Sequence, residues 1–381
     1  MRFEHNTIGE TNAVDAEAFL LAGGFNGMRH IPKAERRFKS CPHAIAALII
    51  LLYVDNNGCR CNCLELRDQF LSDVSKDGRI TLVLEGGFNW FLGVRYSYDL
   101  QSGAVTCDQE AYITTLLHRH GMTDCHPESL PMPNKFDIYA LPVPAKPDKL
   151  LIASYASLCG ELLYISINTA PELSQSMHQL TRFMTKAGPP HLKCAKHVLK
   201  YCKKHRCRTL RWCALDATIP RSPFTIYGFA DASWADDRLG RKSSMFYALF
   251  VNGAAFCWKT QLSSITATST AEAELMSLSA CVQEVMWARN LALELGFGQM
   301  MPTIIYEDNE ACIKMVHKEL NRSRSKHIHL KYCFMHQHYV QGTFDAVPVA
   351  SADQVADIGT ALRPLPQHDR CSRVLHGEPL V

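Results

Sequence analysis

A cluster of prolines most restricts what this chain can fold into. Six of them lie between Met122 and Leu150, at Pro127, Pro131, Pro133, Pro142, Pro144 and Pro147. Proline lacks a backbone N–H and interrupts helices and central strands, so no regular element can run across this stretch. We therefore interpret residues 122–150 as a linker or an extended crossing.

The chain before this linker shows a strand-rich pattern that begins only at about residue 41. Residues 1–40 are poorly patterned. The apolar run Ala46–Val54, the turn residues Asp55–Gly58 and the alternating residues that follow predict a β-hairpin. The remaining periodicity predicts helices over 64–74 and 110–120 and strands over 80–84, 90–98 and 104–107.

Three helices are expected after the linker, over 155–168, 171–186 and 191–205. The third of these is basic, with Lys193, Lys196 and Lys200 among its residues. Such a row could track a phosphate backbone. A solvated helix face explains it equally well, and a formal net charge of +3 does not decide between the two.

The cysteines and the longest apolar run argue against two classes of protein. Sixteen cysteines are spread over the whole chain, which favours reduced thiols over the disulfide scaffold of a small secreted protein. Cys59, Cys61 and Cys63 share one face of an expected strand, and that plain face is favoured over a zinc site. The run Ala44–Val54 is far shorter than the roughly 20 residues of a membrane-spanning helix, so we predict no membrane role.

Two acids lie at the ends of strands in the last part of the chain. From Phe224 onward the order of strands and helices predicts a mixed sheet with helices packed on it. Asp231 ends the strand 227–231 and Asp308 ends the strand 303–308, each on the face of that strand's aromatic residues. Mixed sheets place their functional sites at such strand ends.

A long helix between these strands supplies a third acid. Ser269 and Glu272 form a capping box at its start, which gives Glu272 a structural role. Glu274 lies on the buried stripe of the same helix, and Asp357 lies near the start of a late helix. Four carboxylates brought together repel one another unless a cation neutralises them. The sequence therefore predicts a site for two Mg²⁺ or Mn²⁺ ions held by Asp231, Glu274, Asp308 and Asp357.

Short blocks along the chain resemble the Pol polyprotein of copia-type LTR retrotransposons. Those that are similar to its ribonuclease H domain, in order and spacing, are Gly228–Ala235, Arg241–Ser243, Ser269–Glu274, Tyr306–Asn309, Ser325–Ile328 and Asp353–Ile358. Those that resemble its reverse transcriptase are Leu52–Asn56, Phe91–Val94 and Tyr155–Tyr164. The resemblance covers about residues 18–365.

The resemblance implies an activity and a substrate. It makes the four acids the metal ligands of a nuclease that cuts the RNA strand of an RNA/DNA hybrid. It also makes Arg322, Arg324 and Lys326 part of a loop that contacts the hybrid, although an exposed linker would explain that run as well.

The same resemblance implies that the polymerase site is damaged. The family has two adjacent aspartates where this chain has Asp55 and Asn56, and an amide is a poorer ligand than a carboxylate for a hard divalent ion. The fingers and the earlier palm aspartate of the family would precede residue 1. We therefore expect no nucleotide transfer from this chain alone.

The expected fold class is α/β and α+β: a truncated reverse-transcriptase palm and connection region, then a ribonuclease H-like mixed sheet with flanking helices. The expected division is a polymerase remnant (1–40), a partial palm (41–121), a proline-rich linker (122–150), a helical connection region (151–215), a ribonuclease H-like domain (222–365) and a tail (366–381).

Two alternatives to the nuclease stay open: a decayed, non-catalytic element that at most binds nucleic acid, and an RNA-directed DNA polymerase completed by another chain. Other parts of the polyprotein are possible partners.

Overall fold

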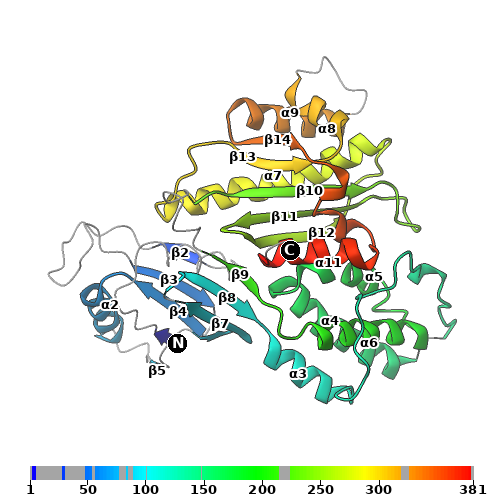
Figure 1. Ribbon diagram of the computed structural model, residues 1–381, viewed down its shortest axis with the longest axis horizontal. Helices are drawn as coiled ribbons and strands as arrows, with labels where there is room; N and C mark the ends of the chain where they lie inside the picture. Colours follow the sequence, from blue (N-terminus) through cyan, green and yellow to red (C-terminus); the bar gives the residue numbers. More distant parts are fainter. Residues whose placement is uncertain are drawn as a thin grey trace. The chain divides into compact units, whose positions relative to one another are not determined.

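The computed structural model describes residues 2–5, 28–30, 48–53, 56–76, 83–84, 89–99, 101–146, 148–213, 224–318 and 326–378. The chain divides into two compact units, Met1–Asp108 with Trp212–Arg221, and Gln109–Arg211 with Ser222–Val381. The predicted six-part division remains a prediction beside these two units, which are described below in turn (Figure 1).

The first unit contains the predicted hairpin. β3 (Leu48–Tyr53) pairs antiparallel with β4 (Asn56–Cys61), with Tyr53 opposite Asn56. Pairing thus begins at Asn56, whereas the sequence predicted turn residues as far as Gly58. The full sheet has the order β2-β3-β4-β1-β5, and its other strands are β1 (Arg2–His5), β2 (Met28–His30) and β5 (Val83–Leu84).

The cysteine-rich strand packs as an ordinary strand face. Cys59 and Cys61 pack against Leu48 and Ile50 of β3 and against the helix α2 (Leu64–Lys76). Burial raises the pKa of the Cys59 thiol to about 12, with a further contribution from Cys61.

The second sheet has the strand order β6-β7-β8-β9. β7 and β8 pair antiparallel with a regular register. The predicted strands over 90–98 and 104–107 correspond to the first three strands of this sheet. Its strands are β6 (Trp90–Phe91), β7 (Val94–Asp99), β8 (Ala104–Asp108) and β9 (Leu210–Trp212).

The second unit begins with a helical region whose helices share one core. The described part of the proline-rich stretch, 122–146, forms one short 3₁₀ turn, η1 (Ile138–Ala140). The helices are α3 (Glu110–Arg119), α4 (Lys149–Asn168), the 3₁₀ turn η2 (Pro171–Leu173), α5 (Ser174–Thr181) and α6 (Pro189–Lys204).

Two helix boundaries in this region differ from the prediction. α4 starts at Lys149 instead of residue 155, because the Asp148 side chain caps it by accepting from the Leu150 amide over 2.9 Å. The helix predicted over 171–186 is divided into η2 and α5 and ends at Thr181. The Thr181 hydroxyl bonds back to the Met177 carbonyl over 2.9 Å, a pattern that often bends helices.

Among the described residues, α4 is the one helix whose length and composition would suit a membrane span. One face of α4, including Tyr155, Leu158 and Leu162, is buried in the core of the helical region. It packs there against α5 and α6. Core helices of globular proteins pass the same test, so this finding is weak evidence for a membrane segment.

A five-stranded mixed sheet follows, with the order β12-β11-β10-β13-β14. β10, β11 and β12 are antiparallel neighbours, whereas β13 runs parallel to both β10 and β14. The strands are β10 (Tyr227–Ser233), β11 (Ser244–Val251), β12 (Ala254–Leu262), β13 (Thr303–Glu307) and β14 (Phe344–Pro348).

Helices pack against both faces of this sheet, because successive side chains of a strand point to opposite sides. Ala232 and Met245 pack with residues of α7 (Thr270–Glu294) on one face. Phe229 and Phe246 pack with α10 (Asp357–Thr360) and α11 (Leu365–His376) on the other. The remaining elements are α8 (Glu310–His317), α9 (Lys326–Val340) and the 3₁₀ turn η3 (Ser351–Asp353).

The last helix is the largest departure from the predicted secondary structure. Residues 366–381 were expected to be a tail, but those described include most of α11. Cys371, Leu375 and His376 of this helix are buried. Their spacing places them on one helix face, and that face packs against β12 and η2.

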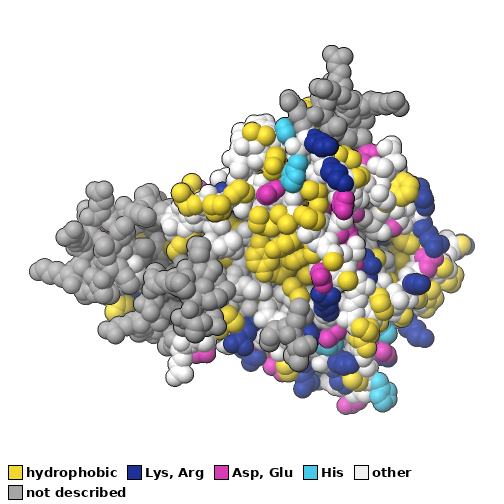
Figure 2. All heavy atoms as spheres, turned by 45° about the horizontal axis from the view of Figure 1, so that its top comes forward, with side chains coloured by type: hydrophobic (Ala, Val, Ile, Leu, Met, Phe, Trp, Pro, Cys, Tyr) yellow, Lys and Arg dark blue, Asp and Glu magenta, His cyan; other side chains and the backbone are white. Residues whose placement is uncertain are grey.

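Apolar side chains also gather on the surface shown in Figure 2. Large hydrophobic residues exposed after β10 include Leu239, Leu293, Met300 and Met301. Single exposed apolar residues are common on proteins. Nothing in the described part of the chain covers Met300 or Met301, which are 93% and 77% exposed.

Candidate metal centre

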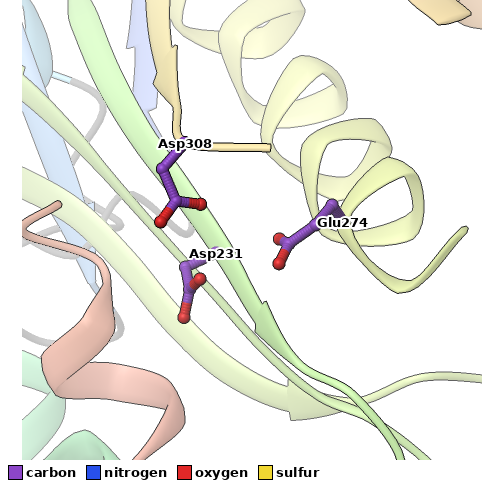
Figure 3. A group of neighbouring side chains, drawn as sticks. All are labelled: Asp231, Glu274 and Asp308. Carbon is purple, nitrogen blue, oxygen red and sulfur yellow. The ribbon is translucent and has the colours of Figure 1, made fainter. Parts of the chain in front are cut away.

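Three of the predicted acids come from two neighbouring strands and one helix. β10 and β13 run parallel with Phe229 opposite Tyr306, so both strands lead to the same edge of the sheet. Asp231 lies near the end of β10, and Asp308 directly follows β13. Glu274 lies in the second turn of α7, which packs on β10. Figure 3 shows the three carboxyl groups gathered around a common space.

The carboxylates of these three residues are crowded. One oxygen from each of Asp231, Glu274 and Asp308 lies within 4.8 Å of the others, and in the described part of the chain no other set of three potential ligands does so. Asp231 and Glu274 are only 7% and 6% exposed, and Asp308 is half-buried. Three acids this close cannot all ionise at low cost without a cation nearby.

The fourth predicted acid, Asp357, is not a member of that group. It begins α10, where Arg363 Nη2 lies 2.9 Å from its Oδ1 and Gln367 Nε2 donates to its Oδ2 over 2.9 Å. Burial and then the charge of Asp231 raise the pKa of Asp357 to about 7, although Arg363 opposes this. Asp357 therefore lies near the three acids, but both of its oxygens already have partners.

The electrostatics of the group suit the binding of a cation. Burial raises the pKa of Glu274, and the nearby Asp231, Glu307 and Asp308 raise it further. Burial also raises the pKa of Asp231. Oε2 of Glu274 is buried without a hydrogen-bond partner. Oxygen atoms in this state suit a hard cation such as Mg²⁺ or Mn²⁺.

Glu307 is a fifth acid that the sequence reasoning missed. It is fully buried at the end of β13, and its Oε2 also lacks a hydrogen-bond partner. Its Oε1 accepts from the Asn309 amide over 3.0 Å and so holds the turn that carries Asp308. The signal was present in the sequence, because strand alternation places Glu307 on the face opposite Asp308, which is the face covered by α7.

The capping box at the start of α7 is present in a modified form. Ser269 Oγ accepts from the Glu272 amide over 3.2 Å, as predicted. The Glu272 carboxylate, however, accepts from the amide and the hydroxyl of Thr268 instead of the Ser269 amide. Glu272 is thus engaged in capping, which leaves Glu274 as the acid of α7 that faces the site.

The basic residues of α6 have different roles. Lys193 and Lys196 are exposed, and Lys200 is half-buried. Lys203 donates to two backbone carbonyls of the proline-rich stretch. Arg208, beyond the helix, lies in a buried cluster with Tyr201, Ser372 and Glu378. Asp55, Arg322 and Arg324, and the side chains of Asn56 and Lys326, lie outside the described residues.

A cavity of about 280 Å³ opens beside the acidic group. Its lining includes Ser233, two residues after Asp231, and Gln175 and His178 of α5. Thr360 also lines it and donates its hydroxyl hydrogen to Asp231. The helical region therefore closely approaches the acidic edge of the sheet.

The predicted fold class is confirmed in that the chain has mixed sheets with flanking helices. No family model matches the sequence. A solved structure of a ribonuclease H1 isolated from compost covers 35% of this chain and 90% of its own, with 12% identity and a TM-score of 0.28.

The sequence relatives are transposon polyproteins. The chain is 24% identical over 331 residues to the retrovirus-related Pol polyprotein of transposon TNT 1-94 from Nicotiana tabacum, which covers 86% of this chain. It is 26% identical over 325 residues to that of transposon RE1 from Arabidopsis thaliana, which covers 83%. The resemblance to copia-type retrotransposon Pol polyproteins is thereby confirmed. The chain spans 24% and 20% of these two relatives' lengths.

Proposed function

We propose that this chain hydrolyses the RNA strand of RNA/DNA hybrids with divalent metal ions held by Asp231, Glu274 and Asp308, and with Asp357 beside them. The observation that carries the proposal is the convergence of three carboxylates from three different elements within 4.8 Å. Two of them are buried, and no basic side chain is hydrogen-bonded to any of the three among the described contacts. An ion-pair network that served only stability would include such a partner.

The oxygen-only ligand set supports two Mg²⁺ or Mn²⁺ ions over a softer metal. Such ions, when bound, would activate a water molecule and stabilise the leaving oxygen during phosphodiester hydrolysis. The acids of this chain would bind and orient the ions. Arg363 and Gln367 hold the Asp357 carboxylate in one orientation at the side of the site.

The RNA/DNA hybrid is proposed as substrate because of the similarity to transposon Pol polyproteins. The exposed Lys193 and Lys196 of α6 are candidates for contacts to its phosphates. The residues Arg322, Arg324 and Lys326 stay candidates from the sequence alone. Other parts of a polyprotein are proposed as further partners.

We expect the polymerase part to be inactive, because Asn56 replaces the second aspartate of the family's hairpin. Primer extension on an RNA template tests this. Extension by this chain alone would contradict the proposal, whereas extension only after a second chain is added would support a polymerase completed in trans.

The experiment that tests the nuclease is cleavage of a labelled RNA/DNA hybrid with Mg²⁺ or Mn²⁺. We expect the wild-type chain to cut the RNA strand and the Asp308→Asn variant to lose this activity. Asp345→Asn serves as the matched control, because Asp345 is a half-buried acid of β14 that pairs with His317 outside the acidic group. An RNA duplex should remain uncut.

The non-catalytic alternative has one observation in its favour. Both oxygens of Asp357 are engaged by Arg363 and Gln367, so this acid is not free to bind a metal in the observed arrangement. A folded wild-type chain that binds the hybrid without cutting it would support this alternative and overturn the nuclease.

A further inference from the structure

Thr360 links the acidic group to the helical region. Its hydroxyl donates to Oδ2 of Asp231 and lowers the pKa of that carboxyl against the effect of burial. Thr360 is 1% exposed and Asp231 is 7% exposed, so water does not compete for this hydrogen bond. A carboxylate whose one oxygen is held by a fixed donor presents its other oxygen in a defined direction.

Thr360 is itself held from two sides. Gln175 of α5 donates from Nε2 to the Thr360 carbonyl over 2.9 Å. Thr260 of β12 donates its hydroxyl hydrogen to the preceding carbonyl, that of Gly359, over 2.9 Å. Gln175 is 2% exposed. The helix α5 of the helical region therefore fixes the backbone of Thr360, the residue that contacts Asp231.

The backbone next to Thr360 is packed tightly against the sheet. A Cβ atom added to Gly359 would lie 2.0 Å from Cγ of Phe246, so the backbone of α10 lies directly against the sheet. Phe246 is fully buried and is paired with Asp231 in the sheet. The carboxylate of Asp231 and the hydroxyl of Thr360 are thus carried by two segments in close contact.

We infer that Thr360 is a positioning residue that orients Asp231 for metal binding, and that Gln175 of the helical region supports it in this role. The inference rests on the proposed metal-dependent function. On this account, part of the affinity of the acidic group for metal depends on α5, whose Gln175 lies 185 residues before Thr360 in the chain. Partners of this kind around metal ligands typically contribute a factor of about 10 to 100 in metal affinity.

The test is Mn²⁺ binding to the full chain by isothermal titration calorimetry, with activity measured only in addition. We expect Thr360→Val to raise the Kd for Mn²⁺ about tenfold or more, because valine keeps the shape but has no hydroxyl. Thr360→Ser should keep the Kd within about threefold of wild type, because serine restores the donor.

The matched control is Thr169→Val. Thr169 is also buried in the second unit, and its hydroxyl donates to Gln109 Oε1 over 2.8 Å. We expect this variant to bind Mn²⁺ like the wild type. An equal loss in both valine variants, or a serine variant as weak as Thr360→Val, would overturn the inference, since either result points to general destabilisation.

Two further outcomes separate this inference from the proposed function. A wild-type chain that binds no Mn²⁺ would overturn the metal site itself. If the wild type and Thr360→Val bind Mn²⁺ with the same Kd, only the role of Thr360 would be overturned. If Thr360→Val does not fold, Gln175→Met decides, and a Kd unchanged in that variant would overturn the inference.

Discussion

At the scale of single residues, the surroundings of Glu274 in the folded protein favour the protonated form of its carboxyl group. Burial raises its pKa above the ordinary value of 4.5, and Asp231, Glu307 and Asp308 add to the effect. The folded protein therefore binds a proton here more tightly than the unfolded chain. Its contribution to stability is fully present below about pH 4.5 and is lost as the pH rises above that value.

We expect Glu274→Gln to stabilise the metal-free protein at pH 8. A single pKa unit corresponds to about 1.4 kcal/mol, and we expect a gain of at least that size. The gain should disappear near pH 4 and shrink at pH 8 when Mg²⁺ is added, because the ion stabilises the wild type. Thermal unfolding in EDTA between pH 4 and 8 measures this.

Glu294→Gln is the control for this measurement, because Glu294 is an exposed acid on the same helix. It should change stability by less than about 0.5 kcal/mol at every pH. A Glu274→Gln variant that is less stable than wild type at pH 8 without metal would contradict the repulsion described here.

Asp231 and Asp308 could be identified as candidates from the sequence because the alternation of each strand, which is a local pattern, puts them at strand ends, whereas the parallel pairing that brings them together is a long-range contact. Glu307 was missed although strand alternation places it on the face opposite Asp308, because a glutamate on a short strand more often faces solvent than a helix. The contacts of Asp357 with Arg363 and Gln367 also could not be predicted from the sequence, because they depend on the turn between α10 and α11.

At the scale of elements, α11 is attached to the helical region by a buried hydrogen bond between a carboxylate and an imidazole. His376 Nε2 lies 2.9 Å from Glu172 Oε2, and the two residues are 1% and 3% exposed. Burial alone would raise the pKa of Glu172, but His376 and then Arg208 outweigh it and lower this pKa to about 2. Glu172 thus stabilises the fold above about pH 4.5, and this contribution is lost as the pH falls toward 2.

We expect Glu172→Gln to destabilise the protein at pH 7 by about 1–3 kcal/mol, because it removes the buried carboxylate that is hydrogen-bonded to His376 and Tyr201. The difference from wild type should shrink below pH 4.5. Urea unfolding at pH 7 and pH 3 measures both effects. Glu128→Gln, which removes a half-buried acid near His197, should change little, and an equal effect of both variants would contradict the role of the buried pair.

Gly359 allows α10 to contact the sheet. We expect Gly359→Ala to cost about 1–3 kcal/mol of stability, because the added Cβ would overlap with the Phe246 ring. Gly160→Ala is the matched control on α4, where the added Cβ meets nothing within 4 Å. That variant should be more stable than wild type by about 0.4–1 kcal/mol. Equal urea midpoints for the two variants would contradict this account.

The hairpin, the two strands that carry Asp231 and Asp308 and the helix α7 were predicted best, because turn residues, apolar strands and the Ser269 cap mark them in the sequence. Element ends were less predictable, as the start of α4 and the end of α5 show. α11 was missed because its apolar residues are few and its buried face includes His368, Ser372 and His376, which a sequence pattern counts as polar.

At the scale of the whole molecule, the acidic group and all the contacts that position it belong to the second unit. We therefore expect a chain of residues 109–381 to fold and to cut RNA/DNA hybrids without residues 1–108. Circular dichroism during heating and the cleavage assay test this. A fragment that folds but does not cut, beside an active full chain, would show that the first unit is required.

The two units could not be derived from the sequence, because the proline-rich stretch suggested a boundary that the contacts do not follow. Lys203 and Lys204 of α6 bond to that stretch and attach it to the helical region. The proline-rich stretch, whose composition indicated a linker, is therefore part of a folded unit. Long-range contacts of this kind leave no local pattern.

The pairing of Glu172 with His376 also sets an order of events at the ribosome. The two residues are 204 positions apart, so Glu172 is synthesised long before its partner exists. At about 5–20 residues per second, this delay is roughly 10–40 s. During that time the helical region must hold the Glu172 carboxylate without the imidazole of His376, and it can reach its final packing only after residue 376 has been synthesised.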